Sequence, residues 1–325
     1  MKMRRPRILV ITPVHHVKGV VELLENIGDI TYLDDPTMSE VMNCIVDYEA
    51  IFTNPNKSQI FIGRKIIDPA TNLQVICTAS TGTNHIDKIY AAEKSIPILA
   101  LTEERHIISK ISSTAELAFA LTLASLRNVV QGYNSVIQGE WDYTKYIGRQ
   151  MNYLTVGVIG YGRLGSMYAG YCRAFGSRVL IFDPYKTIEQ ENVEQVFDLA
   201  VLLSNSDIVA LHVHVTDETC GMINAQRLSQ MKKDVLLVNT SRGDLINEAD
   251  LVNFLHENPL AKVATDVIAD EVINRVTSPL LTLAAERNQV IITPHIGGMT
   301  KEAQEIAYNH AVTMLAHFFS HQRSR

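Results

Sequence analysis

The sequence predicts an α/β protein built from two βα domains. Short runs of β-branched and other apolar residues alternate with helical patterns along the whole chain, which is typical of βαβ units and mostly parallel sheets. The chain has 325 residues, more than one hydrophobic core usually serves. A long helical stretch from Ser113 interrupts the alternation once, so we expect one series of strands before it and a second series after it.

The first series occupies the front third of the chain. Five runs are expected to be strands: residues 7–12, 30–33, 50–53, 74–79 and 97–101. The opening run, RILVITPV, follows several basic residues, as the apolar part of a signal peptide would. It contains a proline and lacks a cleavage site of small residues, so we interpret it as a first strand.

The long helix is expected over residues 113–141. Ser113 and Glu116 have the spacing of a capping box at its start. The stretch is apolar nearly all round, which predicts burial inside a domain or against another subunit.

The second series contains six expected strands, which is the count of a complete dinucleotide-binding domain. They are residues 155–160, 178–183, 207–213, 235–241, 262–267 and 289–295. The final segment, residues 300–322, has the pattern of a long amphipathic helix that would suit a return to the first domain.

Composition excludes several classes of function. The formal charge of −6 argues against broad electrostatic binding to nucleic acid or to an anionic membrane, and no apolar stretch is long enough for a membrane span. The cysteines, at positions 44, 77, 172 and 220, form no CxxC pair. A disulfide framework or zinc site is therefore not expected, no metal is assigned, and a reducing, cytoplasmic location is favoured.

A glycine-rich loop follows the first strand of the second series. Gly160, Gly162 and Gly165 form the pattern GxGxxG between an expected strand and an expected helix. Such a turn brings backbone N–H groups and a helix N-terminus to a pyrophosphate. The next strand ends at Asp183, where a carboxylate hydrogen-bonds the ribose hydroxyls of NAD and repels the extra phosphate of NADP. The alternative is a plain glycine turn and a strand-end aspartate; the strand–loop–helix context favours NAD.

Three ionisable residues follow strands of the same series. Arg242 comes after VLLVNTS, Glu271 after KVATDV and His295 after QVIITP. Ligands in open α/β sheets collect at the carboxyl ends of strands. An arginine there can hold a carboxylate by two parallel hydrogen bonds, and a histidine backed by a carboxylate can exchange a proton near neutral pH. Each residue alone is more often structural, but together they indicate hydride transfer between a nicotinamide and a 2-hydroxy acid.

At these residues the sequence resembles the D-isomer-specific 2-hydroxyacid dehydrogenase family, which includes phosphoglycerate and glycerate dehydrogenases. The resemblance covers almost the whole chain, in family order and spacing. It rests on these stretches: STGTNHID (80–87), STAELAFALTLASLRN (113–128), VGVIGYGRLG (156–165), NTSRGDLINEADL (239–251), ATDVIADE (264–271) and TPHIGGMT (293–300).

The resemblance implies an arrangement of domains and subunits. A Rossmann NAD-binding domain, residues 105–295, is expected to be inserted in a flavodoxin-like substrate domain made of residues 1–104 and 296–325. Family members are usually dimers whose long helix, here from Ser113, packs across the interface, so a homodimer is expected.

The resemblance also implies roles for residues. His295 would be the proton donor and acceptor, Glu271 its partner and Arg242 the substrate anchor, with backbone amides around Ser80, Thr81 and Gly82 receiving the substrate carboxylate. The sequence departs from the family where an aromatic residue and a Glu-Pro pair are common in the acid loop, since Ile268 and Glu271-Val272 stand there. Asp270 adjoins Glu271, and the spacing from Asp266 favours Glu271.

We assign cofactor binding to the glycine loop and to strand-end residues of the second series, namely Gly160, Tyr161, Gly162, Arg163, Leu164, Gly165, Asp183, His212, Thr240, Asp266 and Gly298. For His212 a core role is the alternative, and His214 stands where proline is frequent in the family. Lys57, in the loop FTNPNKSQ, is expected either to hold an anionic tail of the substrate or to lie in a solvated turn.

The sequence therefore predicts an NAD-dependent enzyme that interconverts a D-2-hydroxy acid and its 2-keto acid, with His295 as acid and base. Two alternatives remain open. One is an NAD(H)-sensing binding protein of the corepressor type on the same fold, and the other is a family member that oxidises phosphite or formate. An assay with NADH and a panel of 2-keto acids separates the enzyme from the binding protein.

Overall fold

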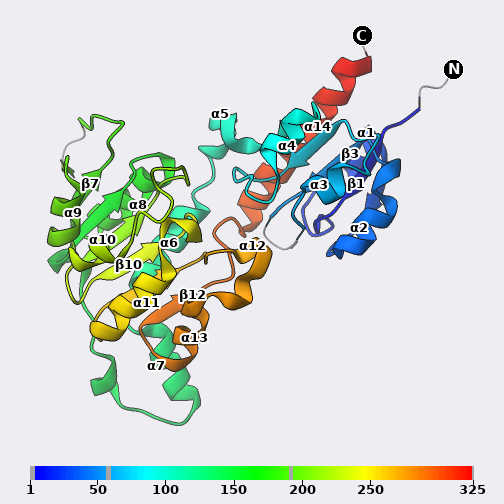
Figure 1. Ribbon diagram of the computed structural model, residues 1–325. Coiled ribbons are helices and arrows are strands. Elements are labelled where there is room, and N and C mark those ends of the chain that lie inside the picture. The colour runs from blue at the N-terminus through cyan, green and yellow to red at the C-terminus, as the bar shows by residue number, and fades with distance from the viewer. Residues whose placement is uncertain (1–3, 56–59, 190–192, 324–325) are drawn as a thin grey trace. The chain divides into compact units, whose positions relative to one another are not determined.

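The computed structural model describes residues 4–55, 60–189 and 193–323 (Figure 1). The chain divides into two compact units, one of residues 1–111 and 299–325 (unit 1) and one of residues 112–298 (unit 2). Each unit contains one sheet of parallel strands with helices packed on it. The expected α/β class with two βα units is confirmed.

Unit 1 has a five-stranded parallel sheet of order β2-β1-β3-β4-β5. This is the flavodoxin-like order, in which successive strands are added to one side of β1 and then, from β3 on, to its other side. Its strands are β1 Arg7–Val10, β2 Asp29–Tyr32, β3 Ala50–Thr53, β4 Val75–Thr78 and β5 Ile98–Leu99. Its helices are α1 Val20–Ile27, α2 Met38–Cys44, α3 Arg64–Ile67, α4 Lys88–Glu93, α5 Arg105–Ile108 and α14 Lys301–Arg323, with short 3₁₀ turns η1 Ile45–Asp47 and η2 Leu101–Glu103.

Both faces of this sheet are covered, which explains why β3 and β4 read as continuous apolar runs. One face packs on α1 and α14, where the Phe52 and Tyr308 rings lie 6.0 Å apart. The other face packs on α2, α3 and α4. Helix α14 therefore completes the core of unit 1 from the far end of the chain, as the sequence predicts.

Unit 2 has a seven-stranded parallel sheet of order β12-β11-β10-β9-β6-β7-β8, the doubly wound order with a further strand β12 at one edge. Its strands are β6 Thr155–Ile159, β7 Arg178–Phe182, β8 Glu194–Gln195, β9 Ile208–Leu211, β10 Leu236–Asn239, β11 Lys262–Thr265 and β12 Val290–Ile292. Six of these are the strands expected from the sequence. The seventh, β8, has two residues, too few to show an apolar pattern.

Helices cover both faces of this sheet as well. They are α6 Ser113–Leu126, α7 Val129–Ile137, α8 Arg163–Ala174, α9 Leu199–Asn205, α10 Ala225–Ser229, α11 Glu248–Glu257, α12 Glu271–Asn274 and α13 Pro279–Glu286, with 3₁₀ turns η3 Tyr143–Tyr146, η4 Met151–Tyr153, η5 Gly243–Leu245 and η6 Arg275–Thr277. Helices α6 and α8 pack on one face, and α9, α10, α11 and α13 on the other. None of the helices in the described part of the chain is both long and apolar enough to cross a membrane.

The single long helix expected over residues 113–141 is wrong. Helix α6 ends at Leu126, Asn128 adopts a left-handed conformation (φ 51°), and α7 starts at Val129. Asparagine tolerates this conformation better than most residues. The end of α6 is fixed by Lys262, whose Nζ donates to the Ser125 carbonyl at 3.0 Å and to Asn128 Oδ1 at 2.5 Å. The chain turns here, where a lysine distant in sequence binds one carbonyl of the last helical turn and the side chain of the left-handed Asn128.

The expected capping box at the start of this helix is also wrong. The N-cap is Ser112, and its hydroxyl donates to the Glu116 carboxylate at 2.5 Å instead of accepting from a backbone amide. Ser113 is the first helical residue and is buried. Helix α6 is nevertheless held in the core of unit 2, as its apolar sequence predicts.

Candidate active site

The glycine loop between β6 and α8 requires glycine for two different reasons. Gly160 has a φ of +89°, and a Cβ there would lie 2.5 Å from the His212 carbonyl oxygen. A Cβ on Gly165 would lie 2.0 Å from the Gly160 carbonyl oxygen, so the helix could not approach the strand. At Gly162, the N-cap of α8, a Cβ would meet nothing within 4 Å. The loop is thus tightly packed behind and open at the helix N-terminus, which fits a pyrophosphate.

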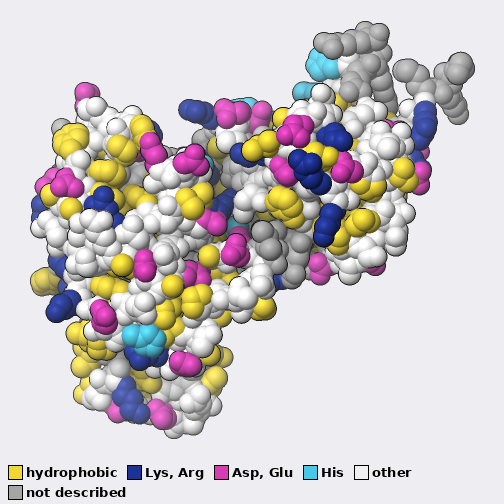
Figure 2. Space-filling model, in the orientation of Figure 1, with side chains coloured by type: hydrophobic (Ala, Val, Ile, Leu, Met, Phe, Trp, Pro, Cys, Tyr) yellow, Lys and Arg dark blue, Asp and Glu magenta, His cyan; other side chains and the backbone are white. Residues whose placement is uncertain are grey.

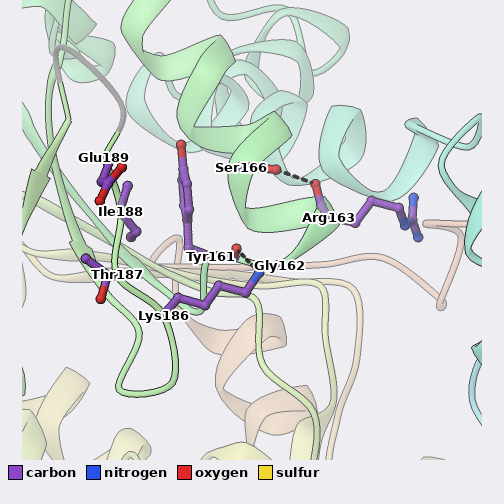
Figure 3. Close-up of a pocket in the computed structure, with 8 residues that line it drawn as sticks. All are labelled: Tyr161, Gly162, Arg163, Ser166, Lys186, Thr187, Ile188 and Glu189. Carbon is purple, nitrogen blue, oxygen red and sulfur yellow. Dashed lines mark hydrogen bonds between the residues drawn. The ribbon is translucent and has the colours of Figure 1, made fainter.

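Asp183 lies against this loop. Its carboxylate accepts hydrogen bonds from the Tyr161 amide at 2.9 Å and the Tyr185 amide at 3.0 Å. A pocket of about 400 Å³ opens beside it, lined by Tyr161, Gly162, Arg163, Ser166, Lys186, Thr187, Ile188 and Glu189 (Figure 3). Lys186 Nζ donates to the Tyr161 carbonyl at 2.8 Å on one wall of the pocket. A carboxylate beside the glycine loop is the arrangement that binds a ribose.

Two polar side chains at the same edge of the sheet are buried without a hydrogen-bond partner among the described residues. They are His212, through both ring nitrogens and next to the end of β9, and Thr240, through Oγ1 and next to the end of β10. Burial lowers the pKa of His212 to about 4, so the imidazole is neutral at neutral pH. Buried polar groups are rarely left unpaired. Together with the glycine loop and Asp183, these groups fit a bound dinucleotide.

His295 and Glu271 form a close pair. His295 Nδ1 lies 2.6 Å from Glu271 Oε1, with the two side chains 21% and 18% exposed. His295 follows β12, and Glu271 begins α12, two segments that the neighbouring strands β11 and β12 bring to one edge. His295 has a φ of +55°, which is uncommon for a residue other than glycine. The pair is partly buried and reaches solvent.

Asp266 holds the turn that carries His295. The His295 amide donates to the Asp266 carbonyl at 2.9 Å, and the Asp266 carboxylate accepts from the amides of Ile296 (2.9 Å) and Gly297 (2.7 Å) and from the Thr293 hydroxyl (2.5 Å). Burial raises the pKa of Asp266, against the opposing effect of these hydrogen bonds and of nearby His295. The carboxylate stabilises the left-handed backbone at His295 by pairing the amides that follow it.

Arg242 follows β10 on the same edge. Burial lowers the pKa of its guanidinium, while the carboxylates of Glu271 and Asp244 act in the opposite direction. Buried Asn239 braces the turn, because its Nδ2 donates to the Arg242 carbonyl at 2.8 Å and its Oδ1 accepts from the Ser241 amide at 3.0 Å. The structure thus places Arg242, Glu271 and His295 on three adjacent strand ends of unit 2, with Glu271 in electrostatic contact with Arg242.

The loops of Arg242 and Glu271 touch directly. A Cβ on Gly243 would lie 2.0 Å from the Ile268 carbonyl carbon and 2.3 Å from the Ala269 nitrogen. The two backbones therefore pack at a distance that only glycine permits. Neither loop can therefore move towards the other without displacing it.

The substrate-binding residues expected from the first series lie in unit 1, after β4. The Ser80 carbonyl accepts from the Leu101 amide at 3.0 Å, and the Gly82 amide donates to Ser80 Oγ at 3.0 Å. The amides of Ser80 and Thr81 have no partner among the residues that the structure describes. Lys57 lies outside the described residues.

Among the residues that the structure describes, the remaining ones expected at the site make no specific contact that bears on its chemistry. Leu164 lies in α8, and a Cβ on Gly298 would meet nothing within 4 Å. His214 is exposed. The described residues contain no group of three or more His, Cys, Asp or Glu side chains arranged for a metal ion.

Two residues of the site were not singled out from the sequence. Asn239 precedes Arg242 by three positions, and Glu248 is buried beneath the acid loop. In the sequence, Asn239 is recognisable only as an amide at the end of a strand. Glu248 is recognisable only as an acid immediately after the helix N-cap Asn247. Both signals are common in chains without any site.

Comparison with known proteins agrees with this geometry. Residues 119–297 match the family model described as D-isomer specific 2-hydroxyacid dehydrogenase, NAD binding domain. The chain is 34% identical to a D-3-phosphoglycerate dehydrogenase of Methanocaldococcus jannaschii, covering 93% of this chain and 55% of the relative. It is 33% identical to a hydroxypyruvate reductase of Blautia hydrogenotrophica, covering 93% of this chain and 91% of the relative. The chain spans about half the length of the phosphoglycerate dehydrogenases that it matches.

Among solved structures, it is similar to a D-lactate dehydrogenase from Aquifex aeolicus complexed with NAD and lactic acid. The TM-score is 0.81 at 28% identity, with 98% of this chain and 96% of the other covered. The likeness spans both units, and the family model covers more than half of the chain. This chain therefore belongs to the D-isomer specific 2-hydroxyacid dehydrogenase family.

Proposed function

We propose that this protein is an NAD-dependent dehydrogenase that interconverts a D-2-hydroxy acid and its 2-keto acid. The observation that carries the proposal is the 2.6 Å contact between His295 Nδ1 and Glu271 Oε1, on the sheet edge that also bears the glycine loop. A histidine oriented by a carboxylate is equipped for proton exchange, which an NAD-sensing binding protein does not need.

His295 moves the proton. Because Glu271 holds Nδ1, Nε2 is the ring nitrogen that takes the hydroxyl proton in oxidation and returns a proton to the keto oxygen in reduction. Bound NAD would supply the hydride acceptor for C2 of the hydroxy acid, and bound NADH the hydride donor for the keto acid. The glycine loop and Asp183 would hold the cofactor, with His212, Thr240, Asp266 and Gly298 along the same edge.

Arg242 would anchor the substrate carboxylate by two parallel hydrogen bonds. The backbone amides of Ser80, Thr81 and Gly82 would receive the same carboxylate. We propose Lys57 as a determinant of substrate choice, because its ammonium group would favour a substrate with an anionic tail.

The experiment that tests the proposal is an assay of the purified protein with NADH or NADPH and a panel of 2-keto acids, including pyruvate, glyoxylate, hydroxypyruvate and 3-phosphohydroxypyruvate. NADH oxidation with at least one 2-keto acid is expected. NADH binding without turnover would support the NAD-sensing alternative, and NAD reduction by formate or phosphite alone would support the other one.

We also propose that the protein is a homodimer joined through residues 129–147, in a reducing, cytoplasmic setting. The segment exposes apolar side chains that α6 and the sheet do not cover, among them Tyr133 (66%), Ile137 (64%) and Trp141 (89%). Figure 2 shows hydrophobic surface on this part of unit 2, at the lower end of the view. A patch of this kind is typical of a subunit interface. All four cysteines are free thiols, which suits the reducing setting.

Sedimentation velocity tests the dimer. Ile137→Asp should convert the protein to monomer, because an unpaired charge would be buried at the interface. Leu260→Asp, at an apolar residue outside the segment that is 74% exposed, should leave the dimer intact. A wild-type protein that sediments as a monomer would contradict the proposal.

A further inference from the structure

The acid loop, residues 269–278, is tied at both ends to one buried carboxylate. Glu248 is the first residue of α11 and is 7% exposed. Its Oε1 accepts from the Ala269 amide at 2.7 Å, and its Oε2 accepts from the Ser278 hydroxyl at 2.6 Å. Glu271 lies between these two ties. Hydrogen bonds to a buried carboxylate are among the stronger ones in proteins.

The path of the loop between the ties needs this support. Asp270 adopts a left-handed backbone (φ 53°) immediately before Glu271, and the following helix α12 has only four residues. A left-handed residue other than glycine persists where its surroundings hold it. Ala269, which is held by Glu248, is also the residue against which Gly243 packs. The tie at Ala269 therefore fixes the point where the loops of Arg242 and Glu271 meet.

We infer that Glu248 is a positioning residue for catalysis, which acts through Glu271. By holding both ends of the acid loop on α11, Glu248 keeps the Glu271 carboxylate at His295 Nδ1. Glu248 touches neither substrate nor cofactor in this role. The inference rests on the proposed function for its kinetic consequences, but the placement of Glu271 can be measured without turnover.

The protonation of the His295 ring depends on the charged groups around it. The described groups next to it are Glu271, from α12, and Asp266, from the end of β11, and Glu271 in turn interacts electrostatically with Arg242. A substitution at Glu248 changes the identity of none of these residues. A shift in the pH at which the His295 ring titrates therefore reports a movement of Glu271, because an adjacent anion favours the charged ring.

The central variant is Glu248→Ala, with Glu248→Gln as the conservative change. Alanine removes both ties. Glutamine can retain both, since its carbonyl accepts from Ala269 and its amide donates to the Ser278 hydroxyl. Glu257→Ala, at an exposed acid of the same helix, is the matched control. Ser278→Ala removes only one tie and serves if Glu248→Ala does not fold.

The first measurement is the NMR titration of the His295 Cε1 proton in the protein without cofactor. We expect its midpoint at lower pH in Glu248→Ala than in wild type, at an intermediate pH in Ser278→Ala, and unchanged in Glu248→Gln and Glu257→Ala. A midpoint that stays in place in both Glu248→Ala and Ser278→Ala, or that moves as far in Glu248→Gln as in Glu248→Ala, would overturn the inference.

The second measurement is the pH profile of kcat/KM for keto-acid reduction. Glu248→Ala should lower kcat/KM about tenfold and move its alkaline limit to lower pH, with NADH Kd nearly unchanged. Adding Glu248→Ala to Glu271→Gln should produce little further loss, because both changes remove the same interaction. A merely structural role would lower the thermal midpoint, leave the pH limit in place and add to Glu271→Gln.

The two measurements separate the inference from the proposed function. A wild-type protein that reduces no 2-keto acid while its His295 titration still shifts in Glu248→Ala would reject the enzyme and retain the positioning role. An active enzyme whose titration and pH limit are unmoved in Glu248→Ala would reject the positioning role alone.

Discussion

At the scale of single residues, His295 carries the most specific chemistry. Replacing His295 by alanine removes the group that exchanges a proton with the substrate oxygen, while the glycine loop and Asp183 remain. We expect turnover to fall by about 10²–10⁴-fold, with NADH affinity nearly unchanged. Steady-state kinetics and fluorescence titration with NADH check this, and turnover within threefold of wild type would refute the role of His295.

Glu271→Gln tests the partner of that histidine. The change removes an anion that favours the protonated ring. Reduction needs the protonated ring, so its activity should be lost at lower pH than in wild type. Oxidation needs the neutral ring, so its acidic limit should also move to lower pH. Profiles measured in both directions check this, and limits that stay in place or move upward would argue that Glu271 is not the partner.

How far residues can be read from the sequence depends on where their partners lie. Arg242, Glu271 and His295 could be singled out because each lies in the segment that follows a strand, and parallel strands end at one edge. Glu248 could not, because its partners Ala269 and Ser278 lie 21 and 30 positions further along the chain. No local pattern records a hydrogen bond over that separation. The left-handed backbone of His295 could not be predicted either, because the amides that follow it bond to Asp266, about 30 positions earlier.

At the scale of elements, the β6–α8–β7 unit sets the choice of cofactor. Asp183 at the end of β7 presents a carboxylate next to the glycine loop, where the extra phosphate of NADP would be repelled. Asp183→Ala should raise kcat/KM with NADPH more than with NADH and so narrow the preference for NADH. Parallel assays with both cofactors check this. A wild-type enzyme that already prefers NADPH would contradict the assignment.

Helices and strands were predictable where their apolar pattern was long enough and their ends did not depend on residues distant in sequence. Strands such as β9 and β10 are buried along their whole length and read as apolar runs. The end of α6 was not predictable, because Lys262 from β11 binds the Ser125 carbonyl and the Asn128 side chain there. The strand β8, at the edge of the seven-stranded sheet, was missed because two residues carry no periodicity.

At the scale of the whole molecule, stability should depend on the protonation of His212. The pKa of its buried ring is about 4 in the folded protein, against 6.5 for the free side chain. Between these values the unfolded chain binds a proton that the folded protein does not, so stability is retained above pH 6.5 and lost as the pH falls towards 4. The difference amounts to about 3 kcal/mol.

The measurement compares wild type with His212→Phe, which keeps a ring to pack on Tyr168. Urea unfolding of unit 2, followed by hydrogen exchange at β6 and β9 amides, gives the free energy of unfolding at each pH. The wild-type curve should fall more steeply than that of His212→Phe between pH 6.5 and 4. Exposed His214→Ala is the control and should follow wild type. Parallel curves for wild type and His212→Phe would disprove the prediction.

The discontinuity of unit 1 has a consequence for synthesis on the ribosome. Its core contains Tyr308, Ala311 and Leu315 from α14, and the Cys77 thiol donates to the Ala311 carbonyl at 3.3 Å, across 234 positions of the chain. Unit 2, by contrast, is one uninterrupted segment. During elongation, unit 2 is completely translated while the sheet of unit 1 still lacks α14 on one face. That exposed apolar face stays uncovered until α14 has been made, and it is where a nascent chain of this protein is most open to chaperones and to misfolding.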